Sequence, residues 1–344
     1  MTTEKKGKSF SIGAFLGEYG ILLALLGLWV VMGLTNKHFL TVNNLFSISR
    51  EASFVGIAAI GMTFVIMTKG IDLSIPAILS LCSVVASLIV DLLGIPLTII
   101  TVVVLGGLCG LINGLFIVGV RIPPFITTLG TFYVFRAIAY ILTGGGTIKI
   151  TNSTYTQIGG GALFSGRGFA GIPYPFFVLL ICLVIGTILL KRTSFGRSIL
   201  AIGNSENASR VAGIDIKRTK VMAYTILGIC SAICAILLSA RLHSARAEMS
   251  ANYAFAVITI VVMGGCALAG GRGNIVSTGI SALFFVSISN AMNNYNVDPF
   301  WQYVINGIIL LFAFSMYNIK DMIAASIEQR RKKREYASAN TESP

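Results

Sequence analysis

The chain has 344 residues, of which 55% are hydrophobic and only 11% are charged, and its formal net charge at pH 7 is +13. A soluble domain usually carries about a quarter charged residues, so the composition excludes that class. Apolar runs near the ~20 residues of a membrane-spanning helix recur along the chain, whereas a β-barrel would show short segments of alternating polarity.

Ten apolar segments predict an all-α, polytopic membrane protein with about ten transmembrane helices. In chain order they are residues 19–35, 52–68, 76–93, 98–118, 125–142, 173–190, 221–240, 254–269, 275–292 and 301–318. No small-residue cleavage site follows the first segment, so it is not read as a cleaved signal peptide. The expected organisation is a cytosolic N-tail (1–18), a transmembrane domain (19–318) and a basic cytosolic C-tail (319–344).

The positions of Lys and Arg predict the topology. With the N-terminus inside, 19 of the 26 basic residues fall in cytosolic segments and six fall outside. This asymmetry follows the positive-inside rule for ten spans with both termini in the cytosol. Basic residues distributed in this way set membrane orientation, so the net charge does not indicate nucleic acid as a partner. The C-tail either only signals topology or also contacts anionic membrane lipid.

Two glycine-containing breaks interrupt apolar runs, at residues 70–76 and 270–274. Each break ends in a helix-capping residue, Ser74 or Asn274. Each is either a cytosolic turn or a helix broken inside the membrane, where irregular backbone survives only when it is buried in protein or lines a cavity. A second parallel relates residues 111–135 to 287–311, since both contain an Asn followed by a Pro-Phe helix start. These parallels predict a pseudo-repeat, a common feature of transporters.

Two longer polar segments separate the spans. The first, residues 143–172, is rich in Gly, Ser and Thr and is expected outside the cell, where it either helps to receive a binding protein or covers the helix ends passively. The second, residues 191–220, is expected in the cytosol and carries seven basic residues. Its length and composition are typical of a structured loop that meets a soluble partner.

The chain shows no sign of an energy source of its own. It has no phosphate-binding loop of the GxxxxGK[ST] type, and no cluster of cysteines or histidines with metal-ligand spacing. Ion-coupled carriers keep ionisable residues in their spans, and here only Asp72 and Arg136 come close to one. The sequence therefore favours an external motor, with no catalytic residue, metal or cofactor in this chain.

Several motifs resemble the permease subunits of ribose-type importers driven by ATP-binding cassettes (ABC importers). They occur in the family's order between about residues 18 and 318: Gly70-Ile71-Asp72-Leu73-Ser74, Ile112-Asn113-Gly114, the run from Pro124 to Thr131, the loop motifs from Thr193 to Ile214, Gly264-Gly265, the run from Gly270 to Gly273, and Gln302-Tyr303. The resemblance implies a fold like that of type II ABC importer permeases, a pathway between two permease subunits, and a place in the inner (cytoplasmic) membrane of a bacterium. It further implies two partners, an extracytoplasmic sugar-binding protein and a cytosolic ATP-binding subunit that uses the ATP.

The resemblance also implies roles for individual residues. The family signature is carried by Gly70, Asp72 and Ser74. The coupling loop would contact the ATP-binding subunit through Phe195, Gly196, Arg197, Ala201, Gly203, Asn204, Ala208, Ala212 and Gly213. Candidate pathway residues are Asn113, Phe125, Thr127, Thr128, Thr131, Asn294, Gln302 and Asn306. Hydroxyl and amide groups suit a polyol because they exchange hydrogen bonds without trapping an ion, but in spans they also serve helix packing.

Two departures from the family pattern leave the partner subunit open. Members commonly carry Tyr-Glu-Leu-Asp where this chain has Tyr253-Ala254-Phe255-Ala256, and a basic residue where it has Asn306. Either the chain pairs with a different permease that retains the acids, or neutral packing replaced the charges in a homodimer. The expected function is import of a monosaccharide such as a ribose-like sugar. The alternatives are an ABC permease for branched-chain amino acids or nucleosides, a stand-alone secondary carrier, and a non-transporting scaffold.

Overall fold

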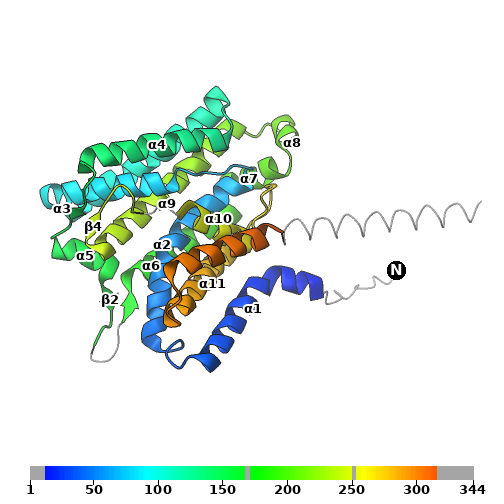
Figure 1. Ribbon diagram of the computed structural model, residues 1–344. Helices are drawn as coiled ribbons and strands as arrows, with labels where there is room; N and C mark the ends of the chain where they lie inside the picture. The colour runs from blue at the N-terminus through cyan, green and yellow to red at the C-terminus, as the bar shows by residue number, and fades with distance from the viewer. Residues whose placement is uncertain (1–11, 167–170, 250–252, 316–344) are drawn as a thin grey trace, which may run out of the picture. The chain divides into compact units, whose positions relative to one another are not determined.

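The computed structural model describes residues 12–166, 171–249 and 253–315, which are mainly helical (Figure 1). The helices are α1 (Ile12–Thr35), α2 (Val42–Met67), α3 (Ile75–Leu115), the π-helical turn η1 (Phe116–Val120), α4 (Pro124–Thr143), α5 (Ser153–Gly160), α6 (Tyr174–Arg192), α7 (Ser194–Asn204), α8 (Glu206–Val211), α9 (Ile216–Leu242), α10 (Tyr253–Met263) and α11 (Ile275–Asn294). A further apolar helix, Pro299–Ser315, belongs to a second unit that begins at Pro299. The predicted C-tail and most of the N-tail lie outside the described residues.

Six helices of the described chain are long and apolar enough to cross a membrane, so the protein is a multi-pass membrane protein. They are Val42–Met67, Ile75–Val120, Pro124–Thr143, Tyr174–Arg192, Ile216–Leu242 and Ile275–Asn294. Shorter apolar helices cover Tyr19–Thr35, Tyr253–Met263 and Pro299–Ser315. Every predicted apolar segment overlaps one of these helices, residues 316–318 of the last lie outside the described residues, and three predictions differ from the structure.

The segments predicted at 76–93 and 98–118 follow each other directly in one long helical stretch, which is interrupted at a single residue, Gly94. Ile75–Val120 has 46 residues and, if straight, would be roughly 69 Å long, more than twice the ~30 Å hydrocarbon core of a bilayer. Its backbone leaves helical geometry at Gly94, with φ 72° and ψ 169°, and Pro96 follows. These angles are accessible essentially only to glycine, so Gly94 separates two helical halves of membrane-spanning length.

The predicted start of the segment 52–68 is wrong, because α2 begins ten residues earlier, at Val42. Arg50 and Glu51 therefore lie inside a membrane-spanning helix rather than in an external loop. Two adjacent charges interrupt the apolar run, and an apolarity criterion ends the segment there even though the helix continues.

The segment predicted at 254–269 is also shorter than expected. Helix α10 has 11 residues and ends at Met263, which makes it roughly 16 Å long, about half the thickness of the hydrocarbon core. Gly264 and Gly265 follow, and Gly265 has a φ of 84°. The chain then runs without regular structure to Asn274, the N-cap of α11, whose side chain accepts a hydrogen bond from the backbone N–H of Val276.

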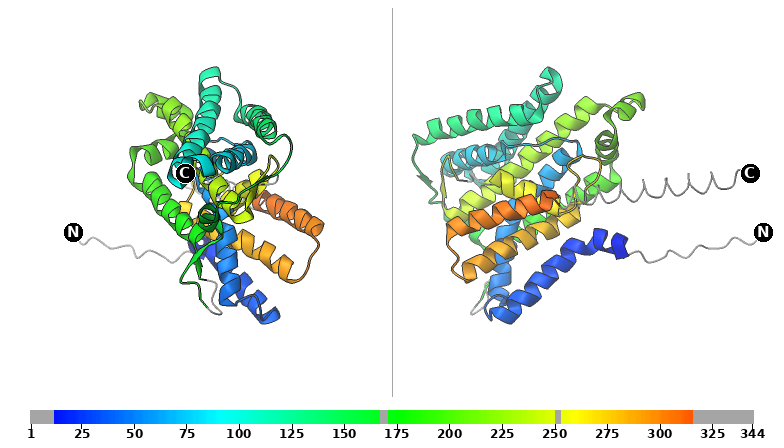
Figure 2. Two further views of the ribbon diagram at one scale, coloured as in Figure 1. Left: turned by 90° about the vertical axis from the view of Figure 1, so that its left-hand side faces the viewer. Right: turned by 45° about the vertical axis from the view of Figure 1, so that its right-hand side comes forward.

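Helix α9 packs against both α2 and α3 along the centre of the first unit (Figures 1 and 2). Its contact with α3 is made at Gly106, Gly110 and Gly114, which recur every four residues on one face. A Cβ on Gly110 would lie 3.0 Å from the Cα of Thr225, so the two backbones touch with no side chain between them. Small residues at this spacing allow membrane helices to approach closely.

The segment 143–172 contains α5 and two small antiparallel ladders. Strand β1 (Ile148–Lys149) pairs with β4 (Ser244–Ala245), and β2 (Ala162–Leu163) pairs with β3 (Ile172–Pro173). In register, Ile148 opposes Ala245 and Ala162 opposes Pro173. These ladders and the packing of α5 on α9 attach the segment to the end of the helix unit.

Candidate functional site

The predicted coupling loop is built from two consecutive helices with a cap at each start. Thr193 caps α7 by accepting a hydrogen bond from the N–H of Gly196 (3.3 Å), and Ser205 caps α8 by accepting one from Ala208 (3.2 Å). Asp215 then caps α9 by accepting one from the N–H of Arg218 (3.0 Å). Each cap satisfies an N–H that the first turn of a helix leaves free. The loop is therefore a folded unit at one end of α9, as both views of α8 show (Figures 1 and 2).

Helix α7 anchors this unit to the rest of the molecule. Phe195, Ile199 and Ile202 are all buried, and the rings of Phe195 and Phe64 are 5.7 Å apart. Gly196 lies against the last turn of α6, close to the backbone of Leu190. The exposed basic side chain of Arg197 and the half-buried Ala201 complete the residues predicted on this helix.

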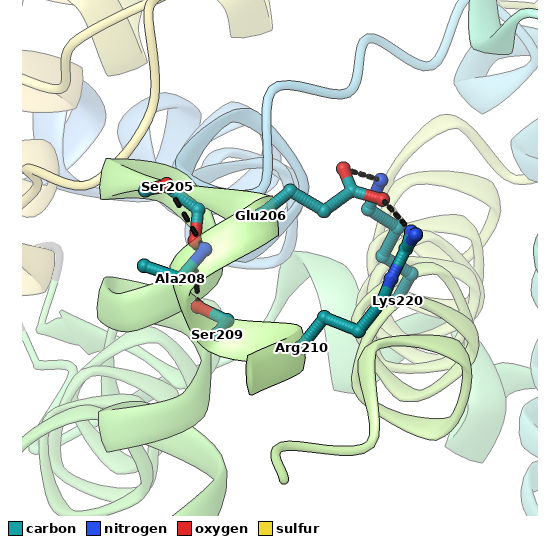
Figure 3. Close-up of polar contacts among 6 residues, drawn as sticks. All are labelled: Ser205, Glu206, Ala208, Ser209, Arg210 and Lys220. Carbon is teal, nitrogen blue, oxygen red and sulfur yellow. Dashed lines mark hydrogen bonds and ion pairs between the residues drawn. The ribbon is translucent and has the colours of Figure 1, made fainter. Parts of the chain in front are cut away.

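Helix α8 presents the exposed surface of the unit. Glu206 holds it to α9 through an ion pair with Lys220 (2.9 Å) and has a longer one with Arg210 (4.0 Å), as Figure 3 shows. Ser209 points inward and donates a hydrogen bond to the carbonyl of Ser205 (2.8 Å). The exposed residues of α8 and the turn after it are Asn207, Ala208, Arg210, Val211, Ala212 and Gly213, of which four are small or apolar.

Gly213 closes this surface with a backbone that favours glycine. Its φ is 76°, and no atom lies within 4 Å of the position that a Cβ would take. The site beside it is therefore open space. Val211, which is 92% exposed, gives the surface an apolar centre. A small, rigid, apolar projection of this kind is suited to insertion into a groove of a soluble partner.

Gly203, at the end of α7, brings three distant parts of the chain together. The N–H of Gly271 donates a hydrogen bond to the carbonyl of Met67 (3.0 Å), and Gly203 lies directly against both residues. A Cβ at position 203 would be 2.6 Å from the Cα of Gly271 and closer still to the Gly271 nitrogen and the Met67 oxygen. The exposed Asn204 follows and also contacts Gly271. We call this contact of residues 67, 203 and 271 the coupling junction.

Both chain breaks predicted from the sequence meet at the coupling junction. Met67 is the last residue of α2, immediately before the first break, and Gly271 lies within the second. The same arrangement of helix, break and helix therefore occurs twice, as α2 to α3 and as α10 to α11. Helix α7 therefore connects α8 to both breaks.

The family signature forms a buried cluster beside the first break. Asp72 is fully buried and accepts hydrogen bonds from the N–H (2.7 Å) and hydroxyl (2.6 Å) of Ser74 and from the side-chain amide of Asn113 (3.1 Å). Burial raises the pKa of the Asp72 carboxyl, and these hydrogen bonds oppose the rise. Gly70 leaves room for the Tyr224 hydroxyl, which would lie 2.5 Å from a Cβ there. The signature thus fixes the path of the break against α3 and α9.

The predicted pathway residues of the first unit do not gather at one site. Asn113 joins the Asp72 cluster, and the hydroxyl of Thr128 accepts a hydrogen bond from the N–H of Leu73 (3.1 Å), so both hold the first break. Thr127 is buried, Thr131 is half-buried, and Phe125 is 55% exposed on α4.

The other pathway candidates lie at the C-terminal end of the described chain. Asn290 of α11 and Asn44 of α2 form a reciprocal amide pair that ties the two helices together. Asn294 donates a hydrogen bond to Asn290 (3.0 Å) and so supports this pair. Gln302 and Asn306 lie on the helix of the second unit.

Arg136, noted in the sequence as a charge within a span, has a partner at the opposite end of α9 from α8. Its guanidinium lies 3.2 Å from Glu248 and 5.3 Å from the centre of the Phe132 ring. The Tyr140 hydroxyl also donates a hydrogen bond to Glu248. This hydrogen bond, and then the charge of Arg136, lower the pKa of Glu248. The contacts join α4 to the segment that follows β4.

Sequence reasoning missed a polar cavity between α2, α10 and α11. Glu51, Tyr253 and Ser289 line it, together with Ala256, one of the positions where the chain departs from the family pattern. The signal was present in the sequence, since Ser47, Glu51 and Val55 are spaced for one face of a helix. Placing the start of the span at residue 52 concealed it.

Comparison with known proteins agrees with a transport role. Residues 44–314 match the family model described as "Branched-chain amino acid transport system / permease component". The ribose import permease protein of Bacillus subtilis (strain 168) is 39% identical over 315 residues, covering 91% of this chain and 96% of that protein. The L-arabinose transport system permease protein of Escherichia coli (strain K12) is 34% identical over 315 residues, covering 91% and 94%. No solved structure matches the chain.

Proposed function

Since this chain belongs to the family described as the permease component of the branched-chain amino acid transport system, we propose that it is the membrane-spanning subunit of an ATP-driven importer for a monosaccharide. The observation that carries the proposal is similarity over nearly the whole chain to permeases named for ribose and L-arabinose. The family's name points to branched-chain amino acids, but the relatives at 30–39% identity are permeases named for ribose, L-arabinose and xylose.

The folded unit of α7 and α8 supports an external motor. An ATP-binding subunit would dock on α8, whose exposed face is small and apolar and is surrounded by the exposed basic residues Arg210, Lys217 and Arg218. Movement of α8 would pass through α7 to the coupling junction and so to both breaks. The chain would change the access of the pathway in this way, with ATP hydrolysed on the partner and no covalent chemistry on the permease itself.

The finer features of the importer are part of the same proposal. The chain would cross the inner membrane of a bacterium ten times with both termini in the cytosol, counting the two halves of α3 separately. Two permease subunits would enclose the pathway, either two copies or this chain with a second permease. An extracytoplasmic sugar-binding protein would deliver the solute at the end that carries α5 and the Arg136–Glu248 pair.

Uptake measurements test the function directly. Cells of the native host, with and without the gene, are given radiolabelled D-ribose, L-arabinose and D-xylose. We expect deletion to abolish uptake of at least one sugar and the cloned gene to restore it. Unchanged uptake of all three would contradict the sugar assignment. Sugar uptake by proteoliposomes that contain only this chain would instead establish a stand-alone carrier.

A further inference from the structure

The cavity between α2, α10 and α11 has a volume of about 460 Å³ and lies away from the coupling junction. Glu51 on its wall precedes Met67 by 16 residues of α2, a distance of roughly 24 Å along the helix. The volume falls within the range of about 300–1,000 Å³ that is typical of small-molecule sites. The cavity is therefore separate from the coupling junction.

Polar groups face this cavity from all three helices. On α2, Ser47 and Glu51 are four residues apart and share one face, and Ser289 faces them from α11. Tyr253, the first residue of α10, adds a phenol to the lining. The polar lining thus consists of two hydroxyls, a phenol and a carboxylate, together with the amides of Asn290 and Asn293.

The Glu51 carboxylate is the unusual group of the lining. A charged side chain inside a membrane-spanning segment is costly and usually has a partner there. None of the ion pairs among the described residues includes Glu51. The charges that act on it are those of Arg241 and Arg50, and both are positive. A hydrogen-bond donor in the cavity would supply the ion-pair or hydrogen-bond partner that no contact among the described residues gives to Glu51.

The rest of the lining indicates the kind of solute. Phe285 contributes an aromatic ring, Val55 contributes apolar surface, and the small side chain of Ala256 leaves space on the α10 side. The two nearby arginines disfavour a cation, and the volume far exceeds that of a bare ion. A neutral ring with hydroxyl groups on its edge and C–H groups on its faces satisfies both the polar and the apolar lining.

We propose that this cavity binds a neutral polyol of monosaccharide size, with the Glu51 carboxylate accepting hydrogen bonds from its hydroxyl groups. The inference rests on the proposed function and deepens it, because it places a solute site within a single permease chain. Bound there, the sugar would interact with α10 and α11, which flank the second break. A sugar bound in the cavity would therefore act on the second break, which α7 also contacts through Gly203 and Gly271.

Binding is tested with the purified full-length chain in lipid nanodiscs, using D-ribose, L-arabinose and D-xylose as probes in saturation-transfer difference NMR. We expect saturable binding of at least one sugar. Glu51→Gln should weaken that binding at least tenfold, because hydrogen bonds to a charged group are worth one to two powers of ten in affinity. Ala256→Phe should abolish binding by filling the cavity. Asp91→Asn, an exposed acid on α3, is the matched control and should bind normally.

The outcomes separate this inference from the proposed function. If both cavity variants are folded and bind and import sugar like the wild type, the inference is wrong and the importer assignment stands. Displacement of the sugar signal by NaCl but not by an unlabelled sugar would also overturn it, in favour of a cation site. If wild-type cells import none of the three sugars and the purified chain binds none, both the inference and the proposed function fail.

Discussion

A single methyl group at Gly203 should uncouple the motor from the breaks. In Gly203→Ala, the new Cβ would lie 2.6 Å from the Cα of Gly271 and closer still to the carbonyl oxygen of Met67. Carbon atoms pack best at about 3.5–4.0 Å, so the three segments must separate by roughly 1 Å or more. All the obstructing atoms belong to the backbone, and no change of side-chain rotamer relieves the contact.

The loss of folding stability in Gly203→Ala is the sum of two costs. Overpacking of a closely packed site costs about 1–3 kcal/mol. Loss of the hydrogen bond from Gly271 to Met67 adds about 1 kcal/mol. The sum is below a typical free energy of unfolding of about 5–15 kcal/mol. We therefore expect the variant to fold and enter the membrane, with a displaced junction and a lower melting temperature.

The assay compares docking with transport. The permease, its ATP-binding subunit and the sugar-binding protein are reconstituted in proteoliposomes, and retention of the ATP-binding subunit is measured alongside ATP-dependent sugar uptake. Gly203→Ala should retain the subunit within about twofold, because α8 is unchanged, but should lose at least tenfold in uptake. Gly130→Ala in α4, where a Cβ meets no atom within 4 Å, is the control and should be normal in both measurements. Full uptake by Gly203→Ala would refute the role of the coupling junction.

Three further changes test other parts of the structure. Gly213→Arg should prevent co-purification of the ATP-binding subunit, because the long side chain would occupy the open space at the docking surface. Gly213→Asn should still co-purify with it, because asparagine tolerates the φ of 76°. Equal loss of the ATP-binding subunit from both variants would indicate backbone strain rather than blocked docking. Burial raises the pKa of Asp72, so its carboxyl should keep a proton above pH 3.8 and give an infrared carboxylic-acid band that disappears in Asp72→Asn. In that pH range the folded chain binds more protons than the unfolded chain. The free energy of unfolding should therefore fall as the pH rises from 3.8 through the raised pKa. Gly94→Ala should lower the free energy of unfolding, measured by denaturant titration in micelles, by about 1–3 kcal/mol, because alanine is strained at the backbone angles of this position. The new Cβ would meet no atom within 4 Å, so steric contact adds nothing to this cost. An unchanged free energy of unfolding would contradict the assignment of the strain.

The helices and their breaks could largely be predicted from local composition, whereas the contacts between them could not. Apolar length and glycine clusters indicated where the chain turns, including the interruptions at 70–76 and 270–274, although α10 ends at Met263, before the predicted end of its segment at residue 269. The charged pair Arg50-Glu51 misled the same criterion, because it breaks an apolar run without ending the helix. Glu51 faces a cavity between α2, α10 and α11, and local composition does not reveal such a cavity.

The candidate site illustrates the same limit. Ala208, Ala212 and Gly213 were predicted to contact the ATP-binding subunit, and all three are exposed in the structure. The partners of Gly203 could not be predicted, because Met67 and Gly271 are far from it in sequence and meet it only through the packing of α7. Asn113 and Thr128 were predicted to line the pathway, which stays a prediction, and the hydrogen bonds by which they hold the first break could not be predicted from their chemical type.

Helix α9 is fastened at both of its ends. Glu206 holds its first turn through Lys220 (2.9 Å), and the Tyr155 hydroxyl of α5 lies 2.9 Å from the hydroxyl of Ser239 near its last turn. Its 27 residues make a rod of roughly 40 Å. A tilt of about 5° about one end would move the other end by roughly 3–4 Å over that length. The helix therefore has the geometry of a lever, in which a small rotation at the α8 end becomes a displacement of atomic size at the α5 end.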